Sequence, residues 1–409
     1  MPKFRPFKAV RPANGLEEKI AALPYDVVDR QGVLEEIKKR PESFLQIDRP
    51  DAFFDENFNP YSKEVYQKGA EIFKDYLKTE KFIKENEACY YIYEQTMDGR
   101  TQTGIVGCSS VDDYINDKIK KHEFTRKEKE EDRVNHVDYL NANTGPIFLT
   151  FKDDQDVSDL LEKLKSKNKP LFDFTLNDVR QRGFIIKDKA DIDLIQRKMN
   201  NISSFYIADG HHRAASAVRV AKMRRKDNPN YNGDEEFNFF LSIVFPAEEL
   251  KIYAYNRILK TNKDISAIAE KAKSKFSVQK TDKLENPKNK KEFLMFNKDE
   301  IYSLVAKEEL FSGKDIVESL DVSVLQDNLL EPVFGIEDPR TNENIDFIGG
   351  IFTPKEVRER LNENEIAFCL HGVSTDELMQ IADEGKVMPP KSTWFEPKLL
   401  SGLFIHLLK

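Results

Sequence analysis

The chain has 409 residues, of which 39% are hydrophobic and 33% charged, and its formal net charge at pH 7 is −8. A chain of this length is too long to fold around one ordinary hydrophobic core, so we expect two to four structural units in a soluble globular protein. The acidic balance and the interspersed charges argue against a nucleic-acid scaffold, and the longest apolar runs are too short to span a membrane. Three scattered cysteines and an opening segment without a signal-peptide core predict a cytoplasmic location.

Residues 1–85 are predicted to form an N-terminal segment. Pro24 favours an extended or turn conformation around Tyr25, because the proline ring restricts its own backbone and that of its neighbour. Helices are expected over residues 31–40 and 61–79, and the second of these carries an apolar stripe.

Residues 86–260 are predicted to form the core of the protein. Apolar runs bounded by turn residues predict strands at residues 88–94, 102–108, 147–151, 183–186, 205–208, 237–245 and 251–259. Helical patterns predict helices at residues 126–140, 158–167 and 191–199, and from residue 213 to about 226. The first two strands read as a hairpin, and we expect the last two to pair with each other. The alternation of strands and helices predicts an α/β layer.

Residues 261–409 are predicted to form a C-terminal α/β segment. Helices are expected at residues 265–276 and 322–330, and a hairpin is expected from residues 293–296 and 301–304. The lysine-rich stretch at residues 280–291 has the composition of an exposed linker.

The densest group of reactive side chains follows the buried strand at residues 205–208. These residues are Asp209, Gly210, His211, His212 and Arg213. Gly210 suits a tight turn into a helix whose N-terminus presents free backbone N–H groups and a positive dipole end. Together with two imidazoles and a guanidinium, this arrangement suits a phosphate. A simpler interpretation is that Asp209 caps the helix and the other side chains are solvated, but so many polar groups in five positions favour a site.

A second motif, at residues 120–125, contains His122, Glu123 and Thr125. In isolation it is equally well explained as a surface turn. If it meets the turn at residues 209–213 across a sheet, Glu123 becomes a candidate general base beside a phosphate cradle. Magnesium would then neutralise phosphate charge nearby.

A third motif contains Lys391, Ser392 and Thr393 near the end of the sequence. The lysine suits an anion and the hydroxyls suit hydrogen bonds, but packing explains this segment equally well. The glycines of a Walker A loop are missing, so a P-loop is excluded.

Taken together, these motifs resemble the domain-of-unknown-function family 1015 over essentially the whole chain. The motifs are, in chain order, Pro24-Tyr25-Asp26-Val27, Lys121-His122-Glu123-x-Thr125, Asp132-Arg133, Asp209-Gly210-His211-His212-Arg213 and Pro389-Pro390-Lys391-Ser392-Thr393.

The motif at residues 209–213 also looks like the signature turn of the ParB/sulfiredoxin-like superfamily. His211 stands where sulfiredoxin-like members have a cysteine, and no helix-turn-helix pattern follows Arg213, so the resemblance points to neither a sulfiredoxin nor a DNA-reading protein. The motif is similar to that of free-serine kinases. This resemblance implies an α/β (α+β) fold in which residues 86–260 form a mixed-sheet core of the ParB/sulfiredoxin-like type.

The same resemblance implies a nucleotide-dependent phosphotransferase that uses ATP or ADP with magnesium. The leading acceptor is free L-serine, which would become O-phospho-L-serine. The implied catalytic residues are Glu123, Asp209, His211 and His212, with Asp209 also available to magnesium. The implied binding residues are His122, Thr125, Gly210, His211, His212, Arg213, Lys391, Ser392 and Thr393. A phosphoserine phosphatase and a non-enzymatic nucleotide- or phosphometabolite-binding regulator remain open, as does homo-oligomer formation.

Overall fold

The computed structural model describes all 409 residues and divides the chain into two compact units. The first unit contains residues 1–250 and 397–409, and the second contains residues 251–396. Residues 1–85 therefore belong to the same unit as the predicted core. No helix in the structure combines the length and apolar character needed to cross a membrane.

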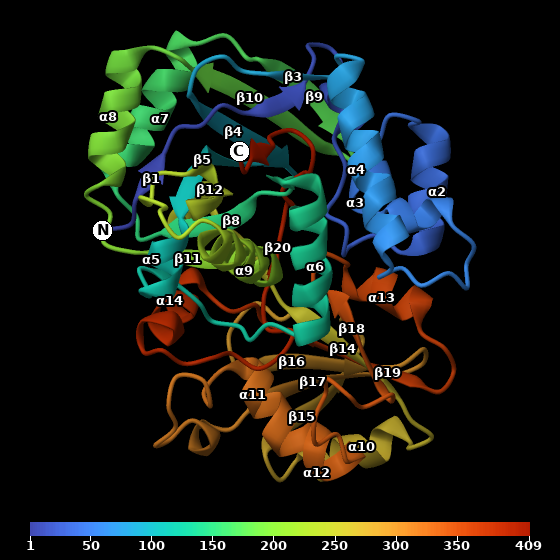
Figure 1. The fold of residues 1–409 in the computed structure, drawn as a ribbon. Coiled ribbons are helices and arrows are strands. Elements are labelled where there is room, and N and C mark those ends of the chain that lie inside the picture. Colours follow the sequence, from blue (N-terminus) through green and yellow to red (C-terminus); the bar gives the residue numbers. More distant parts are fainter. The chain divides into compact units, whose positions relative to one another are not determined.

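A nine-stranded mixed sheet forms the centre of the first unit (Figure 1). Its strand order is β6-β11-β8-β12-β5-β4-β10-β9, with β1 paired to β5. Most neighbours are antiparallel, whereas β6 runs parallel to β11 and β8 runs parallel to β12. The strands are β1 (Phe4–Arg5), β4 (Tyr90–Met97), β5 (Arg100–Ser110), β6 (Ile119–Lys120), β8 (Ile147–Phe151), β9 (Phe172–Leu176), β10 (Val179–Ile186), β11 (Phe205–Asp209) and β12 (Phe239–Pro246). The prediction of a mixed-sheet α/β core is confirmed.

The predicted hairpin of β4 and β5 is present, with Met97 opposite Arg100. Asp98 and Gly99 both adopt positive φ angles, of 52° and 75°. Two such residues in a row produce a turn whose twist matches that of the flanking strands. The Asp-Gly pair therefore fixes the register of two strands in the middle of the sheet.

Helices pack on the sheet through one continuous core. The helices of this region are α5 (Val111–Ile115), α6 (Lys127–Leu140), α7 (Gln155–Lys167), α8 (Lys189–Met199) and α9 (His211–Asp227). Apolar residues of α7, α8 and α9 join the buried side chains of β4, β5, β8, β11 and β12 in one cluster. The α9 residues in this cluster are Ala214, Ala217, Val218 and Ala221, whose small side chains allow the helix to lie close to the sheet.

The opposite face of β4 is also covered. Phe404 packs against Tyr91 and Tyr93, at ring-centroid distances of 4.9 and 5.9 Å, and Phe7 packs against Tyr91. Burial on both faces explains why the Tyr90 to Tyr93 run is apolar throughout and does not alternate with polar residues.

Residues 397–409 return to the beginning of the chain. They pair β21 with β7 and form isolated bridges from Ile405 to Val10 and from Ser401 to Ala22. Ile405 also belongs to the second apolar cluster, which the N-terminal helices build. The elements are β2 (Val10–Pro12), α1 (Glu17–Ile20), α2 (Arg30–Lys39), α3 (Leu45–Asp48), α4 (Lys63–Lys78), β3 (Phe82–Lys84), β7 (Ala142–Asn143) and β21 (His406–Leu407). The two ends of the sequence thus share one core.

The second unit contains a six-stranded antiparallel sheet of order β15-β17-β16-β19-β14-β18 and a separate pair, β13 and β20. Its strands are β13 (Ile252–Tyr253), β14 (Tyr255–Lys260), β15 (Phe276–Thr281), β16 (Glu292–Phe296), β17 (Ile301–Ala306), β18 (Ile345–Gly349), β19 (Glu365–Leu370) and β20 (Trp394–Phe395). Its helices are α10 (Ile265–Ala272), α11 (Asp321–Leu325), α12 (Glu331–Phe334), α13 (Pro354–Arg360) and α14 (Thr375–Asp383).

One sequence-based prediction about strand pairing was wrong. The strands expected at residues 237–245 and 251–259 do not pair with each other, because β12 belongs to the large sheet and β14 pairs with β18 and β19. The stretch at residues 280–291, expected to be an exposed linker, starts within β15 and continues as a mostly exposed connection to β16. Apolar strand patterns identify strands but carry no information about their partners.

Candidate phosphate-binding site

The sharp turn between β11 and α9 positions the central motif. The first four residues of β11 are buried, and Gly210 then adopts a φ of +92°, a left-handed conformation that favours glycine. Helix α9 starts at His211, and no side chain caps its N-terminus. Its first turn also contains no acidic residue. The positive end of the α9 dipole is therefore not neutralised by the helix's own side chains.

The short strand β6 brings the second motif to this turn. Ile119 and Lys120 pair in parallel with Phe205 and Tyr206 of β11, so both strands end on the same side of the sheet. The rings of His122 and His211 consequently meet edge to face, with centroids 4.5 Å apart. The Glu123 carboxylate lies 3.7 Å from Nδ1 of His211, with 45% of its side chain exposed. The structure thus brings together the two motifs that the sequence separates by more than eighty residues.

Burial keeps the two facing histidines neutral. It lowers the pKa of His122 from its usual 6.5 to about 4. Burial also holds the pKa of His211 well below its usual value, and the neighbouring His122 lowers it further. Neutral imidazoles each retain one acceptor nitrogen, which can hydrogen-bond a donor or bind a metal ion.

His212 and Thr125 have other partners beside the turn. Nε2 of His212 accepts a hydrogen bond from the backbone N–H of Arg126, at 3.0 Å, which leaves Nδ1 to carry the proton of the neutral ring. The Thr125 hydroxyl donates to Glu130, at 2.8 Å. The phosphate-binding roles of His212 and Thr125 stay predictions.

Two cations surround the Asp209 carboxylate. Nζ of Lys398 lies 3.5 Å and an Nη atom of Arg213 3.8 Å from Oδ2 of Asp209, and the Gly210 N–H donates to Oδ1 at 2.8 Å. Although burial acts to raise it, these two cations hold the pKa of Asp209 well below its usual range. Both carboxylate oxygens are already engaged, so this environment does not fit a magnesium ion bound directly to Asp209.

Lys398 was not recognised from the sequence. It lies 189 positions after Asp209, and no motif surrounds it. The only available signal is indirect: a carboxylate at the end of a buried strand requires a cationic partner, but the sequence does not say which one.

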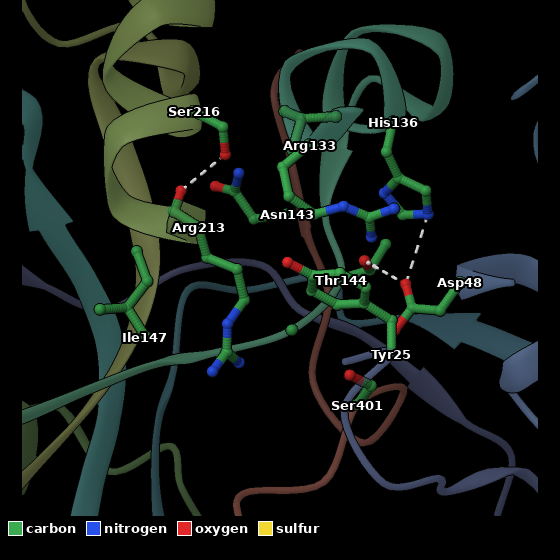
Figure 2. A pocket seen from close by; sticks show the side chains of 12 residues that line it. Tyr25, Asp48, Arg133, His136, Asn143, Thr144, Ile147, Arg213, Ser216 and Ser401 are labelled. Atoms are coloured by element: carbon green, nitrogen blue, oxygen red, sulfur yellow. Dashed lines mark hydrogen bonds and ion pairs between the residues drawn. The ribbon is translucent and has the colours of Figure 1, made fainter. Parts of the chain in front are cut away.

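A polar pocket adjoins the turn on the side of Arg213 (Figure 2). Helix α6 contributes Arg133 and His136, and Arg213 and Ser216 reach it from α9. The remaining lining residues are Tyr25, Asp48, Val137, Asn143, Thr144, Gly145, Ile147 and Ser401. Three of the motifs that suggested the family, those containing Tyr25, Arg133 and Arg213, therefore contribute to one pocket.

Contacts with neighbouring residues fix the positions of the two arginines of the pocket. The Arg133 guanidinium lies over the Tyr25 ring, 3.8 Å from its centroid, and forms an ion pair with Asp132 at 2.9 Å. Arg213 donates to the carbonyl oxygen of Pro146 at 2.7 Å. Fixed guanidinium groups lose little conformational freedom when they bind an anion, which favours tight binding.

Burial of His136 in the wall of this pocket makes the free energy of unfolding depend on pH. Burial, assisted by Arg133, lowers the pKa of His136 from 6.5 to about 4, while Nε2 of the ring lies 3.2 Å from the Ile47 carbonyl oxygen and 3.3 Å from Asp48. The His136 side chain binds a proton more readily in the unfolded chain than in the folded one. The contribution of His136 to the free energy of unfolding is therefore fully present above about pH 6.5 and falls as the pH drops towards 4.

We expect a His136→Gln variant to lose less stability on acidification than the unsubstituted protein. From about pH 7.5 to about pH 5, the difference in the free energy of unfolding should be about 2 kcal/mol. Urea unfolding of both proteins at several pH values measures it, and comparing the two cancels the contributions of other groups. Parallel pH profiles would contradict the assignment to His136.

The third motif belongs to the second unit. Lys391 has a φ of 57°, and its carbonyl oxygen accepts a hydrogen bond from Arg257 at 3.1 Å. The hydroxyl of Ser392 is part-buried and donates to the Pro389 carbonyl oxygen at 2.7 Å. Thr393 is half-buried. The predicted substrate-binding roles of Lys391, Ser392 and Thr393 stay predictions.

The fold and the site define an α/β protein with a mixed central sheet, whose strand–turn–helix element carries two histidines and an arginine at a helix N-terminus. The chain belongs to the family described as "Protein of unknown function (DUF1015)", whose family model matches residues 4–323. The family resemblance suggested by the motifs is thereby confirmed for residues 4–323, whereas the motif at residues 389–393 lies outside the matched range. No curated protein matches the sequence.

Several solved structures share a distant similarity with the chain. A free serine kinase variant in complex with AMP is 15% identical, with coverage of 71% of this chain and 87% of the kinase and a TM-score of 0.36. A conserved hypothetical protein from Pyrococcus furiosus is 16% identical over 73% of this chain and 94% of its own, with a TM-score of 0.34. SbnI with a C-terminal truncation, from Staphylococcus aureus, is 11% identical over 72% and 85%, with a TM-score of 0.36.

Proposed function

We propose that the chain binds the phosphate groups of a nucleotide at the β11–α9 turn and transfers a phosphoryl group to a small hydroxyl compound. The observation that carries this proposal is the convergence of four groups at one place. They are the uncapped α9 N-terminus, Arg213, the neutral His211 and the exposed Glu123 carboxylate 3.7 Å from that histidine. The first three suit a phosphate, and the fourth suits a proton acceptor.

Each phosphate-binding group has a distinct role in this proposal. The backbone N–H groups of the first turn of α9 and the Arg213 guanidinium hold the phosphate oxygens, while His212 supplies a further N–H donor. Lys398 and Arg213 keep Asp209 ionised, so that Asp209 fixes the arginine in position. Magnesium bound with the nucleotide would neutralise phosphate charge.

Glu123 is the proposed general base. Its carboxylate takes the proton of the acceptor hydroxyl as that oxygen attacks the terminal phosphorus. The bond between this phosphorus and the bridging oxygen breaks, and the nucleotide leaves with one phosphate fewer. Because the Glu123 side chain is 45% exposed, it can reach a substrate that enters from solvent.

Charged side chains beside the turn favour an acceptor that carries both charges of an amino acid. Arg133 suits a carboxylate, and the buried Asp48 suits an ammonium group. Free L-serine combines these charges with a hydroxyl. Together with the similarity of residues 209–213 to the motif of free-serine kinases, this makes L-serine the leading acceptor and O-phospho-L-serine the product.

Phosphorus NMR of the purified protein tests the proposal. The samples contain magnesium, ATP or ADP, and a pool of small hydroxyl metabolites that includes L-serine. We expect a new phosphomonoester signal that requires both the nucleotide and one acceptor. Release of phosphate from O-phospho-L-serine without nucleotide would identify a phosphatase instead. Nucleotide binding by calorimetry without any turnover would identify a regulatory protein.

A further inference from the structure

Three donor groups beside the turn converge on one point. His122 and Glu123 follow β6, and His211 opens α9. One ligand atom from each of these residues lies within 4.8 Å of the other two. Donor atoms around a tetrahedral ion bound at 2.0–2.2 Å are about 3.4 Å apart, so the three side chains need only a small inward movement to share one ion.

The two histidines have unused nitrogen atoms in a buried position. His122 is 1% exposed and His211 5% exposed. Both ring nitrogens of His122 and Nε2 of His211 lack a hydrogen-bond partner. Buried polar atoms in folded proteins are almost always paired, because burying one without a partner is costly. A bound ligand would give the ring nitrogens of the buried His122 the partner that the polypeptide does not supply.

We propose that His122, His211 and Glu123 bind a divalent transition-metal ion of the Zn²⁺ and Mn²⁺ class. Two neutral imidazoles and one carboxylate form a donor set that these ions favour, whereas magnesium prefers oxygen donors alone.

A site with three protein ligands leaves at least one coordination position open. A water molecule or a phosphate oxygen can occupy that position, where the ion would polarise it. Coordination through one oxygen of Glu123 leaves its second oxygen for a proton. The site does not depend on phosphoryl transfer, since a metal-binding regulator would need the same three residues.

Calorimetric titration of the chelator-treated, full-length protein with Zn²⁺, without any nucleotide, tests the site. We expect one equivalent to bind and the thermal unfolding temperature to rise. Co²⁺ should give visible absorption bands that Zn²⁺ abolishes. Glu123→Gln and His122→Ala should each weaken Zn²⁺ binding at least tenfold, whereas His371→Ala, which changes a histidine of the second unit, should leave it unchanged.

Two results would overturn the proposal. One is the absence of saturable Zn²⁺ binding by the folded protein, and the other is unchanged binding in both the Glu123 and the His122 variants. If His122→Ala fails to fold, Glu123→Gln still decides the question, because the Glu123 side chain is 45% exposed and glutamine has almost the same size. Neither result affects the phosphorus NMR experiment, which reports on the phosphotransferase proposal separately.

Discussion

Replacing Glu123 by glutamine should lower the rate of phosphoryl transfer by about 10²- to 10⁴-fold, the range over which general bases contribute. Glutamine keeps the size of the side chain and removes its capacity to accept a proton. Nucleotide affinity should change by less than about threefold, because the α9 N-terminus and Arg213 hold the phosphates in this proposal. Turnover measured with saturating nucleotide and acceptor, together with calorimetric nucleotide binding, separates the two effects.

Glu128→Gln is the matched control for this variant. Glu128 is an exposed glutamate in the first turn of α6, five positions from Glu123, and it should tolerate the same substitution without loss of turnover. If Glu123→Gln retains full turnover, the general base lies elsewhere in the site. If nucleotide binding is lost together with turnover, Glu123 acts in binding and its role as a base is wrong.

Replacing Gly210 by alanine should damage both stability and the site. A left-handed backbone costs a residue with a side chain about 1–2 kcal/mol, and crowding against a packed neighbour adds about 1–3 kcal/mol. The added Cβ would lie 3.0 Å from Nε and from an Nη atom of Arg213. We therefore expect the free energy of unfolding to fall by about 2–5 kcal/mol and nucleotide affinity to fall at least about tenfold as the guanidinium is displaced.

Gly233→Ala separates backbone strain from displacement of Arg213. Gly233 has almost the same φ, 95° against 92°, but a Cβ there would meet nothing within 4 Å. This variant should show only the backbone cost in urea unfolding and should bind nucleotide normally. Equal nucleotide affinities for the two alanine variants would show that Arg213 does not depend on Gly210 for its position.

Local sequence patterns predicted the elements that build the site. The buried strand β11, the turn at Gly210 and helix α9 were all expected from an apolar run, one glycine and a series of small residues. These signals are local, since hydrophobic periodicity and backbone freedom depend on adjacent residues. The expected helices α2, α4 and α6 are likewise present for the same reason.

These local patterns could not predict which distant segments of the chain contact each other. β6 has only two residues, too few for any periodicity, yet its pairing with β11 brings Glu123 to His211. Sequence reasoning could state this meeting only as a condition. The partnership of Lys398 with Asp209 had no sequence signal, and the expected pairing of residues 237–245 with 251–259 failed because each strand has a better partner elsewhere.

The return of residues 397–409 to the first unit determines when the site can be completed during synthesis. Lys398 neutralises Asp209, and Ser401 lines the pocket, but all of residues 251–396 are translated before either residue exists. Until then, Asp209 lacks one of its two cations and the β4 face lacks Phe404. The second unit consists of consecutive residues and can fold first, whereas the first unit must close a very long loop late. A growing chain therefore lacks the complete set of contacts around Asp209 until residues 397–409 have been made.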